Sequence, residues 1–161
     1  MAIPQRIRDY LDSQNVLFEP IHHSQAFTGQ EVAHTMHISG KRLAKTVVLA
    51  ADGKPVMAVI PASHRLNFQE FRAALEVDRL EMLPESDLVK MFPDCDKGAI
   101  PPFGNLYGLT VWVERTISDG EDVVFCAGTH EDCMRMKYSD FARLTQPRLG
   151  RFSEAGAAKA A

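Results

Sequence analysis

Lys45 stands at the head of an apolar run that reads Thr46-Val47-Val48-Leu49. The alternation of side chains along a strand would put Lys45 on the same face as Val47 and Leu49. A lysine among hydrophobic side chains is uncommon, because burial removes the ammonium group from water. Such a lysine either carries its charge to solvent along its aliphatic stem or holds an anionic or carbonyl-bearing ligand at the mouth of a sheet.

The second candidate for chemistry is the segment 98–104, which reads Gly-Ala-Ile-Pro-Pro-Phe-Gly. Two prolines make its centre stiff, and the glycines at its ends allow backbone angles that other residues avoid. Such a segment forms either a rigid surface loop or a frame that presents backbone N–H groups to a ligand oxygen, as oxyanion sites do. Both interpretations stay open at this point.

The third candidate is the tetrapeptide Ala127-Gly128-Thr129-His130, which follows an apolar run and precedes another. Gly128 is suited to a positive φ or to the close approach of a ligand. His130 is either exposed in a simple hairpin turn or part of a site. Residue types alone do not decide between these two roles.

Several kinds of site are not indicated by the sequence. The three cysteines, Cys95, Cys126 and Cys133, form no CxxC pair, which argues against a disulfide framework and for a reducing compartment. Cys126 lies in an apolar run and is predicted to be a small hydrophobic residue. No zinc-ligand spacing, phosphate-binding P-loop or dinucleotide fingerprint is present, so we expect neither a metal nor a cofactor.

Length and composition indicate the class of protein and the partners it could have. A chain of 161 residues with 45% hydrophobic and 24% charged residues is typical of one globular domain, predicted over 1–147 with a flexible tail over 148–161. The net charge of -3 argues against DNA and confines any RNA contact to a local basic patch. Without a signal-peptide core or a long apolar run, the sequence predicts a cytoplasmic protein that does not enter membranes.

The order of the predicted elements is irregular. The sequence predicts strands over 16–22, 45–51, 55–61, 79–83, 109–114, 122–127 and 133–138. It predicts helices near the N-terminus, after Pro84, and after the capping residues Thr28, Asn67 and Ser139. Asp52-Gly53 should join two of the strands as a hairpin. Strands and helices do not alternate regularly, which favours an α/β fold of the α+β type: a mixed, largely antiparallel, barrel-like sheet surrounded by helices.

The three motifs in this order resemble the YbaK/prolyl-tRNA-synthetase-associated domain, a family of aminoacyl-tRNA deacylases. The resemblance covers roughly residues 3 to 146 and implies a YbaK-like fold. The family's strand lysine falls on Lys45, its glycine/proline loop on 98–104, and its late turn on Gly128 with Thr129 and His130.

The resemblance also implies an activity. Such proteins are hydrolases that free tRNA from wrongly attached amino acids, and a chain without a synthetase domain is expected to act in trans. The expected partners are an aminoacyl-tRNA, held by its terminal adenosine and its amino acid, and an aminoacyl-tRNA synthetase. The amino acid is expected to be small, such as alanine, serine, threonine or cysteine, with tRNA(Pro) as one candidate carrier. An asparagine usually follows the lysine in the branch that favours alanine, and Thr46 stands there instead.

The resemblance assigns roles to particular residues. Lys45, Gly98 and Gly128 are the expected catalytic residues, with Lys45 anchoring the terminal nucleotide or the ester carbonyl and backbone N–H groups forming the oxyanion site. The expected substrate-binding residues are Phe27, Thr28, Lys41, Arg42, Thr46, Ile60, Ile100, Pro101, Pro102, Phe103, Gly104, Thr129 and His130. Two alternatives remain open: a non-catalytic module that docks to a synthetase or tRNA, and a hydrolase of another small acyl ester.

Overall fold

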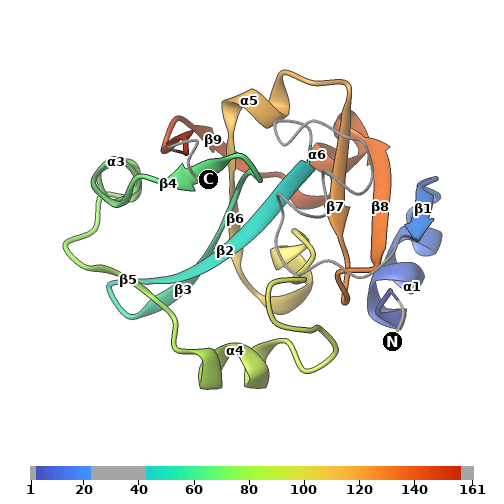
Figure 1. Ribbon diagram of the computed structural model, residues 1–161, viewed down its shortest axis with the longest axis horizontal. Coiled ribbons are helices and arrows are strands. Elements are labelled where there is room, and N and C mark those ends of the chain that lie inside the picture. Colours follow the sequence, from blue (N-terminus) through green and yellow to red (C-terminus); the bar gives the residue numbers. More distant parts are fainter. Residues whose placement is uncertain (1–2, 23–42, 157–161) are drawn as a thin grey trace.

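A computed structural model describes residues 3–22 and 43–156 of the chain. Its centre is a mixed sheet in which the strands follow the order β1-β8-β7-β2-β3-β6-β9, with β5 pairing the far end of β2 (Figure 1). The strands are β1 Glu19–His22, β2 Leu43–Ala51, β3 Lys54–Pro61, β5 Leu80–Met82, β6 Thr110–Glu114, β7 Asp122–Cys126, β8 Asp132–Lys137 and β9 Arg148–Gly150. A separate pair joins β4 His64–Leu66 to β10 Ser153–Ala155. The predicted mixed, largely antiparallel sheet is confirmed.

The hairpin of β2 and β3 is the longest pairing in the sheet, from Ala44 opposite Pro61 to Ala51 opposite Lys54. Asp52 and Gly53 turn the chain with φ of 49° and 83°. Two consecutive positive φ angles are those of a type I′ turn, which matches the twist of the strands it joins. The predicted hairpin is therefore confirmed.

The pairing of β2 with β7 is parallel and very short. It joins only Leu43 to Val124 and Ala44 to Phe125. Beyond these residues the two strands separate, and β2 runs toward β5 while β7 continues toward β8 (Figure 1). A sheet that opens between two parallel strands leaves backbone and side chains of both strands facing a common gap, where ligands often bind in α/β proteins.

Five α-helices surround the sheet in the described ranges: α1 Gln5–Ser13, α3 Phe68–Leu75, α4 Glu85–Met91, α5 Arg115–Ser118 and α6 Tyr138–Thr145. The predicted cap of α3 is confirmed, because Asn67 Oδ1 accepts a hydrogen bond from the Glu70 N–H at 3.0 Å. The prediction that Ser139 caps the last helix is wrong. That helix begins two residues earlier, at Tyr138 after Lys137, and has no side-chain cap.

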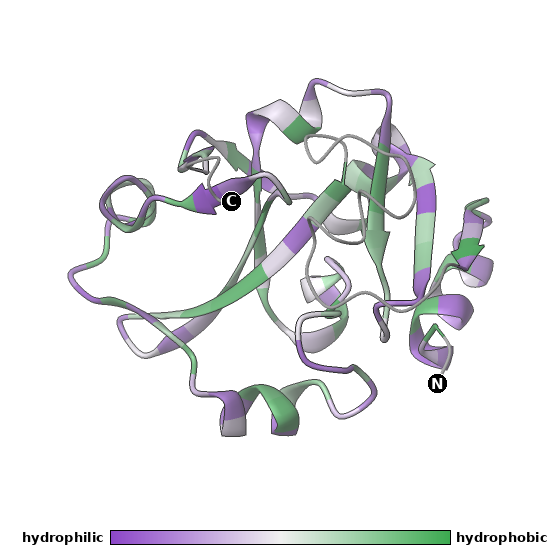
Figure 2. Ribbon diagram, viewed as in Figure 1, coloured by the Kyte–Doolittle hydropathy of each residue, from purple (hydrophilic) through white to green (hydrophobic). Residues whose placement is uncertain are grey.

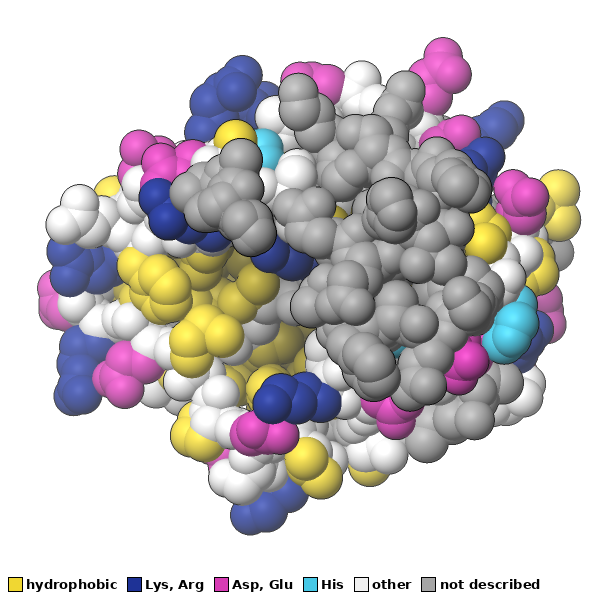
Figure 3. Space-filling view, in the orientation of Figure 1, with side chains coloured by type: hydrophobic (Ala, Val, Ile, Leu, Met, Phe, Trp, Pro, Cys, Tyr) yellow, Lys and Arg dark blue, Asp and Glu magenta, His cyan; other side chains and the backbone are white. Residues whose placement is uncertain are grey.

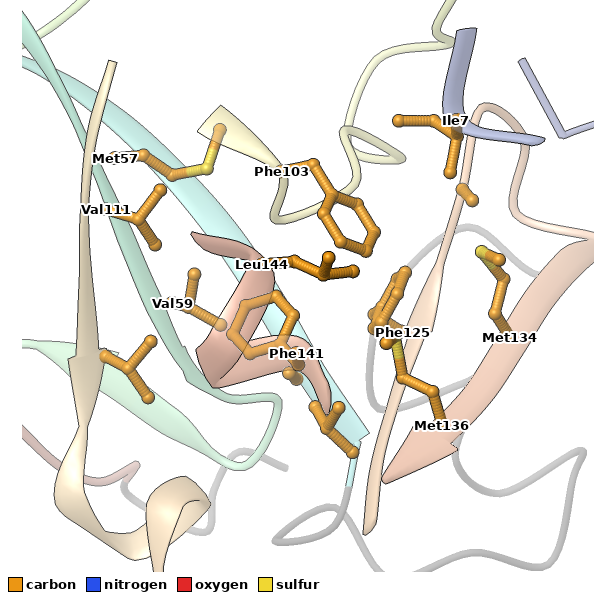
Figure 4. Close-up of a cluster of buried hydrophobic side chains, with 14 of the residues drawn as sticks. Ile7, Met57, Val59, Phe103, Val111, Phe125, Met134, Met136, Phe141 and Leu144 are labelled. Atoms are coloured by element: carbon orange, nitrogen blue, oxygen red, sulfur yellow. The ribbon is translucent and has the colours of Figure 1, made fainter. Parts of the chain in front are cut away.

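The main core lies on the face of the sheet that α1, α6 and the loop before β6 cover. Figure 4 shows aromatic, aliphatic and sulfur-containing side chains converging there. Phe103 is at the centre, edge-on to Phe125 at 5.5 Å and to Phe141 at 5.6 Å between ring centroids. Figure 2 shows that β7, which supplies Phe125, is mainly hydrophobic along its length.

A second apolar cluster lies on the opposite face of β2 and β3, and the C-terminal segment completes it. Phe152 is fully buried and stacks on Phe71 with 4.6 Å between ring centroids. The buried Glu114 carboxylate accepts hydrogen bonds from the N–H groups of Phe152 and Ser153, each at 2.8 Å. The prediction of a flexible tail from residue 148 is therefore wrong for residues 148–155, which form β9 and β10.

None of the helices in the described ranges combines the length and the apolar character that crossing a membrane requires.

Candidate active site

Lys45 lies on β2 immediately after the two residues that pair with β7. It stands opposite Ile60 of β3, and directly opposed residues of an antiparallel pair project from the same face of the sheet. Ile60 is fully buried, whereas Lys45 is partly buried. Burial lowers the pKa of the Lys45 ammonium from its ordinary value. Among residues 3–22 and 43–156, no side chain forms an ion pair or hydrogen bond with it.

Two apolar clusters flank Lys45 on this face. One contains Leu43 and Val124, and the other contains Val47, Leu49 and Ile60. Figure 2 shows a hydrophilic band in β2 between hydrophobic stretches. Lys45 is the one charged residue in that strand. A cation in such surroundings attracts an anion or a carbonyl oxygen more strongly than it would in water, because the local dielectric constant is lower.

The surface around this strand is also distinctive. Figure 3 shows hydrophobic side chains gathered in a hollowed area over β2 and β3, beside the residues that are not described, with lysine and arginine side chains at its edge. An apolar floor with cationic groups at its rim suits a ligand that has both a small apolar part and phosphates.

The structure brings the glycine/proline loop and the late turn together. The Asp96 N–H donates to the Gly128 carbonyl at 2.7 Å, and the Gly128 N–H donates to the Ala99 carbonyl at 2.8 Å. Gly98, with φ of 79°, lies between these two contacts, and Gly128 itself has φ of 91°. Both glycines adopt left-handed backbone angles that other residues reach only with strain.

These contacts change the role of Gly128. Its N–H is already bonded to Ala99, so the expectation that it supplies an oxyanion-site donor is not supported. The N–H groups of Gly98 and Ile100 form no hydrogen bond with any described residue. Phe103 and Gly104 also have no hydrogen-bond partner for their N–H groups among the described residues, but both are buried, so Gly98 and Ile100 carry the donors that a ligand oxygen can reach.

His130 holds the same loop from the other side. Its Nε2–H donates to the Lys97 carbonyl at 2.8 Å, and a Cβ on Gly98 would come within 3.2 Å of its ring. The absence of a side chain at position 98 therefore lets His130 pack against the backbone. His130 supports Gly98 directly in this arrangement.

Thr129 organises the turn through its hydroxyl group. Thr129 is buried, and Oγ1 accepts the N–H groups of Glu131 and Asp132 at 3.2 and 3.1 Å and donates to the Asp132 carboxylate at 2.7 Å. Every hydrogen-bonding position of the hydroxyl is used, so the structure does not support substrate contact by Thr129. Asp132 is not among the residues predicted from the sequence, although a threonine followed three residues later by an acidic residue is a signal for such local bonding.

Five other predicted substrate-binding residues are buried. Phe103 and Ile60 have no exposed surface, and Pro101 and Pro102 are buried as well. Gly104 is buried too, and a Cβ there would come within 2.9 Å of Val111 Cγ2. These residues pack the protein, and the structure does not support their contact with a substrate. Ile100 is only partly buried and lies at the exposed end of the loop.

Thr46 lies on the opposite face of β2 from Lys45, between Ala44 and Val48 of the main core, and is partly buried. The remaining predicted substrate-binding residues, Phe27, Thr28, Lys41 and Arg42, lie outside the described residues.

Cys126 and Cys133 stand directly opposite each other on β7 and β8 and form a disulfide. The sequence argument against a disulfide framework did not foresee this single pair, because cross-strand proximity cannot be seen in the spacing of the two cysteines. Cys95 is the remaining free cysteine.

Two hollows of about 650 and 600 Å³ lie away from these residues. The larger is lined by Asp119, Glu121 and Asp122, together with Pro61, His64, Thr116, Gly120 and Ala155. Three carboxyl groups would repel phosphates, so this hollow does not suit a polynucleotide. Within the described ranges, no three His, Cys, Asp or Glu side chains are grouped as metal ligands would be.

The comparison with protein families agrees with the geometry. Residues 23–144 match the model of the aminoacyl-tRNA editing domain. The chain belongs to the aminoacyl-tRNA editing domain family. Lys45, the 98–104 loop and the turn at Gly128 all fall within the matched segment, whereas α1, β1, β9 and β10 lie outside it.

Curated relatives of this editing domain include proline–tRNA ligases. The ligase of Streptococcus gordonii is 30% identical over 105 residues, which are 65% of this chain and 17% of the ligase. That of Leuconostoc citreum is 25% identical over 156 residues, which are 92% of this chain and 27% of the ligase. The chain therefore spans only a part of the length of these ligases.

Solved structures share the fold at low sequence identity. A hypothetical protein superposes with a TM-score of 0.82 and 16% identity, covering 92% of this chain and 99% of its own. A proposed trans-editing enzyme for prolyl tRNA synthetase superposes with a TM-score of 0.80 and 14% identity, covering 93% and 96%. The editing-domain fold is thus present over most of the chain.

Proposed function

We propose that this protein is a trans-acting deacylase that hydrolyses the ester of a small amino acid wrongly attached to tRNA. The observation that carries the proposal is Lys45, a partly buried ammonium group with no partner among the described residues, at the point where β2 and β7 separate. Membership of the editing-domain family and the similarity to proline–tRNA ligases support aminoacyl-tRNA as the class of substrate.

The reaction needs modest assistance, because an aminoacyl ester is already activated. Water attacks the carbonyl carbon, the bond to the ribose oxygen breaks, and the ribose oxygen takes a proton to leave free tRNA and the amino acid. An enzyme accelerates this reaction by holding the ester still and by stabilising the negative charge on the carbonyl oxygen. No strong protein nucleophile is required.

In this proposal Lys45 binds the ester carbonyl or the terminal phosphate by charge and hydrogen bonding. The free N–H groups of Gly98 and Ile100 supply the remaining donors for the developing oxyanion. His130 and Gly128 hold the loop that carries these donors. The ribose hydroxyl next to the ester assists the water.

Selectivity for a small amino acid would come from the space beside Lys45. A difference of one methylene group in a pocket changes binding by only ~1–3 kcal/mol. We therefore expect overlapping activity on alanine, serine, threonine and cysteine. Thr46 projects toward the main core and not toward Lys45, so its influence on this choice would be indirect.

Binding of the tRNA body is expected to be weak and sensitive to salt. The net charge of the chain is -3, so attraction to phosphates depends on a few local cations. Arg135 of β8 already contacts Glu19 at 4.0 Å, which reduces its contribution. An affinity for tRNA that stays constant between low and high salt would contradict this expectation.

The first experiment is deacylation of tRNA charged separately with alanine, serine, threonine, cysteine and proline. Wild type is compared with Lys45→Ala and with Lys54→Ala, which removes an exposed lysine at the tip of the same hairpin. We expect loss of one or a few charged species with wild type and Lys54→Ala, and about 10²–10³-fold slower loss with Lys45→Ala.

A folded wild-type protein that deacylates none of these species would overturn the proposal. Binding of aminoacyl-tRNA without hydrolysis would then indicate a docking module. Hydrolysis of a small amino-acid ester, tested in parallel, would indicate a hydrolase of another acyl ester.

A further inference from the structure

The ends of the glycine/proline loop are joined by side chains that the proposed chemistry does not use. The Tyr107 hydroxyl donates to the Asp94 carboxylate, with oxygens at 3.3 and 3.5 Å. Asp94 precedes the loop and Tyr107 follows it. A surface segment of this size whose ends meet is an Ω-loop, and its shape depends on what holds those ends together.

Arg6 of helix α1 contacts both ends of the loop at once. Its Nε lies 3.8 Å from Asp94 Oδ2, and its guanidinium carbon lies 4.4 Å from the centre of the Tyr107 ring. Its Nη1 donates to the Leu106 carbonyl at 3.5 Å. The Arg6 guanidinium group therefore forms an ion pair at one end of the loop, and a cation–π contact and a backbone hydrogen bond at the other end.

The partial burial of Tyr107 strengthens this arrangement. Phe92 packs on the Tyr107 ring with 4.5 Å between centroids. Burial raises the pKa of the Tyr107 hydroxyl, so this group stays protonated and keeps its role as donor. Burial, followed by the charge of Asp94, raises the pKa of the neighbouring Cys95 thiol to about 12, which keeps that thiol neutral.

The middle of the loop is held separately, by the two backbone hydrogen bonds to Gly128 and by His130. Contacts at both ends and in the middle leave little freedom to Gly98 and Ile100. We infer that Arg6, Asp94 and Tyr107 form a clamp that holds the free N–H groups of Gly98 and Ile100 in their catalytic positions. The inference rests on the deacylase function proposed above.

The clamp assigns a task to a helix that the family comparison does not cover. Helix α1 precedes the matched segment, which begins at residue 23. Ile7 and Leu11 of α1 are fully buried in the main core, so the helix is fixed and can present Arg6 at a constant position. Arg6 is thus a positioning residue that acts through the loop.

Two substitutions and two matched controls test the clamp. Tyr107→Phe removes only the hydroxyl group, and Arg6→Gln removes the guanidinium group. Tyr138→Phe is the control for the first, because the Tyr138 hydroxyl is partly buried and has no hydrogen bond with a described residue. Arg8→Gln, on the same helix, is the control for the second.

Hydrogen exchange of the Ala99 and Gly128 amides reports on the loop itself. We expect exchange at these amides to be about fivefold faster or more in Tyr107→Phe and Arg6→Gln and unchanged in both controls, because exchange follows local opening. We expect kcat to fall about fivefold to tenfold with KM within about twofold, since a displaced loop slows the chemical step more than binding. Arg6→Lys should recover part of the rate by restoring the cation.

Unchanged exchange in both clamp variants would overturn the inference, as would faster exchange without any loss of kcat. A folded wild-type protein that hydrolyses none of the charged tRNAs would instead count against the proposed function. In that case the exchange rates of the Ala99 and Gly128 amides in Tyr107→Phe and Arg6→Gln still test whether the clamp holds the loop.

Discussion

At the scale of single residues, the site is defined by which polar groups are already engaged and which are free. Lys45 has no partner among the described residues, while Gly128 N–H, His130 Nε2 and Thr129 Oγ1 are all bonded within the protein. A partly buried charge without a partner lowers stability, and residues of that kind are commonly kept for function. Lys54 also has no partner among the described residues but is exposed, whereas Lys45 is partly buried.

Lys45→Met should abolish activity without weakening the fold. We expect deacylation to fall about 10²–10³-fold, because the charge that binds the ester is gone. Thermal unfolding should occur at the same or a higher temperature, since the variant no longer buries an ammonium group. Kinetics and thermal unfolding, with Lys54→Met as the exposed control, check both expectations. A large drop in stability would mean that Lys45 is a structural residue.

The same substitution should show a characteristic dependence on pH. Burial lowers the pKa of Lys45 from 10.5, so the unfolded chain binds more protons between the lowered value and 10.5. The free energy of unfolding of the wild type should therefore rise with pH through that window. The amount by which the free energy of unfolding of Lys45→Met exceeds that of the wild type should then become smaller. Urea unfolding of both proteins at neutral pH and near pH 10 measures the difference. A constant difference would contradict the assigned cause.

Asp132→Asn should weaken the turn at neutral pH. Partial burial of Asp132 favours its neutral form, but the hydrogen bond from Thr129 and the contact with His22 outweigh that and lower its pKa. A lowered carboxyl pKa contributes stability above the unfolded value of 3.8, and that stability is lost as pH falls through the folded value. We expect a loss of ~1 kcal/mol at pH 7 and a smaller loss near pH 3, measured by urea unfolding. An equal loss at both pH values would show that charge is not involved.

At the scale of elements, the site depends on a loop and a turn that hold each other. The 98–104 loop and the turn after β7 are far apart in sequence, and backbone hydrogen bonds of Gly128 to Ala99 at 2.8 Å and to the preceding Asp96 at 2.7 Å join them. Gly98 makes this contact possible because a side chain there would meet His130. The arrangement fixes the free donors of the loop relative to the turn that follows β7.

Comparing Gly98→Ala with a matched glycine variant should separate the cost of backbone strain from the loss of deacylation. Gly53 has a nearly equal φ of 83°, and a Cβ there would meet nothing within 4 Å, so Gly53→Ala is a matched control. Both variants should lose about 1–2 kcal/mol of stability from the left-handed backbone. Only Gly98→Ala should also lose deacylation, by an expected tenfold or more, because the added methyl group displaces His130. Equal activity of the two variants would exclude a role for the loop.

At the scale of the whole molecule, the C-terminal segment completes the fold beyond the matched family segment. β9 extends the large sheet beside β6, and β10 pairs with β4. Phe152 fills the second cluster between Phe71 and Trp112. The cluster lies on the face of β2 that also carries Lys45, so the segment supports the strand on which the proposed chemistry depends.

Phe152→Ala should therefore destabilise the whole protein. Loss of a fully buried phenylalanine typically costs ~3–5 kcal/mol, because a cavity remains. The neighbouring Arg151 is exposed, and Arg151→Ala should change stability by less than about 0.5 kcal/mol. Urea unfolding of both variants measures the difference. A small effect of Phe152→Ala would show that the segment is dispensable for the fold.

The amino-acid sequence is sufficient to predict those elements that a few neighbouring residues specify. Asp52-Gly53, the alternating run after Lys45 and the cap at Asn67 each depend on a few neighbouring residues, and all three were predicted correctly. Lys45 was also found this way, since a charge in an apolar strand is visible in the sequence. The motifs further indicated the editing-domain family.

Contacts between distant parts of the chain determine which polar groups are bonded and which segments are neighbours. The short contact of β2 with β7, the bond from Gly128 N–H to Ala99 and the clamp of Arg6 on the loop all join residues that are far apart in sequence. The ordered C-terminal strands depend on the pocket between Phe71 and Trp112 and on the buried Glu114. Such pairings gain their free energy from packing and hydrogen bonds across the fold, and no local pattern specifies them.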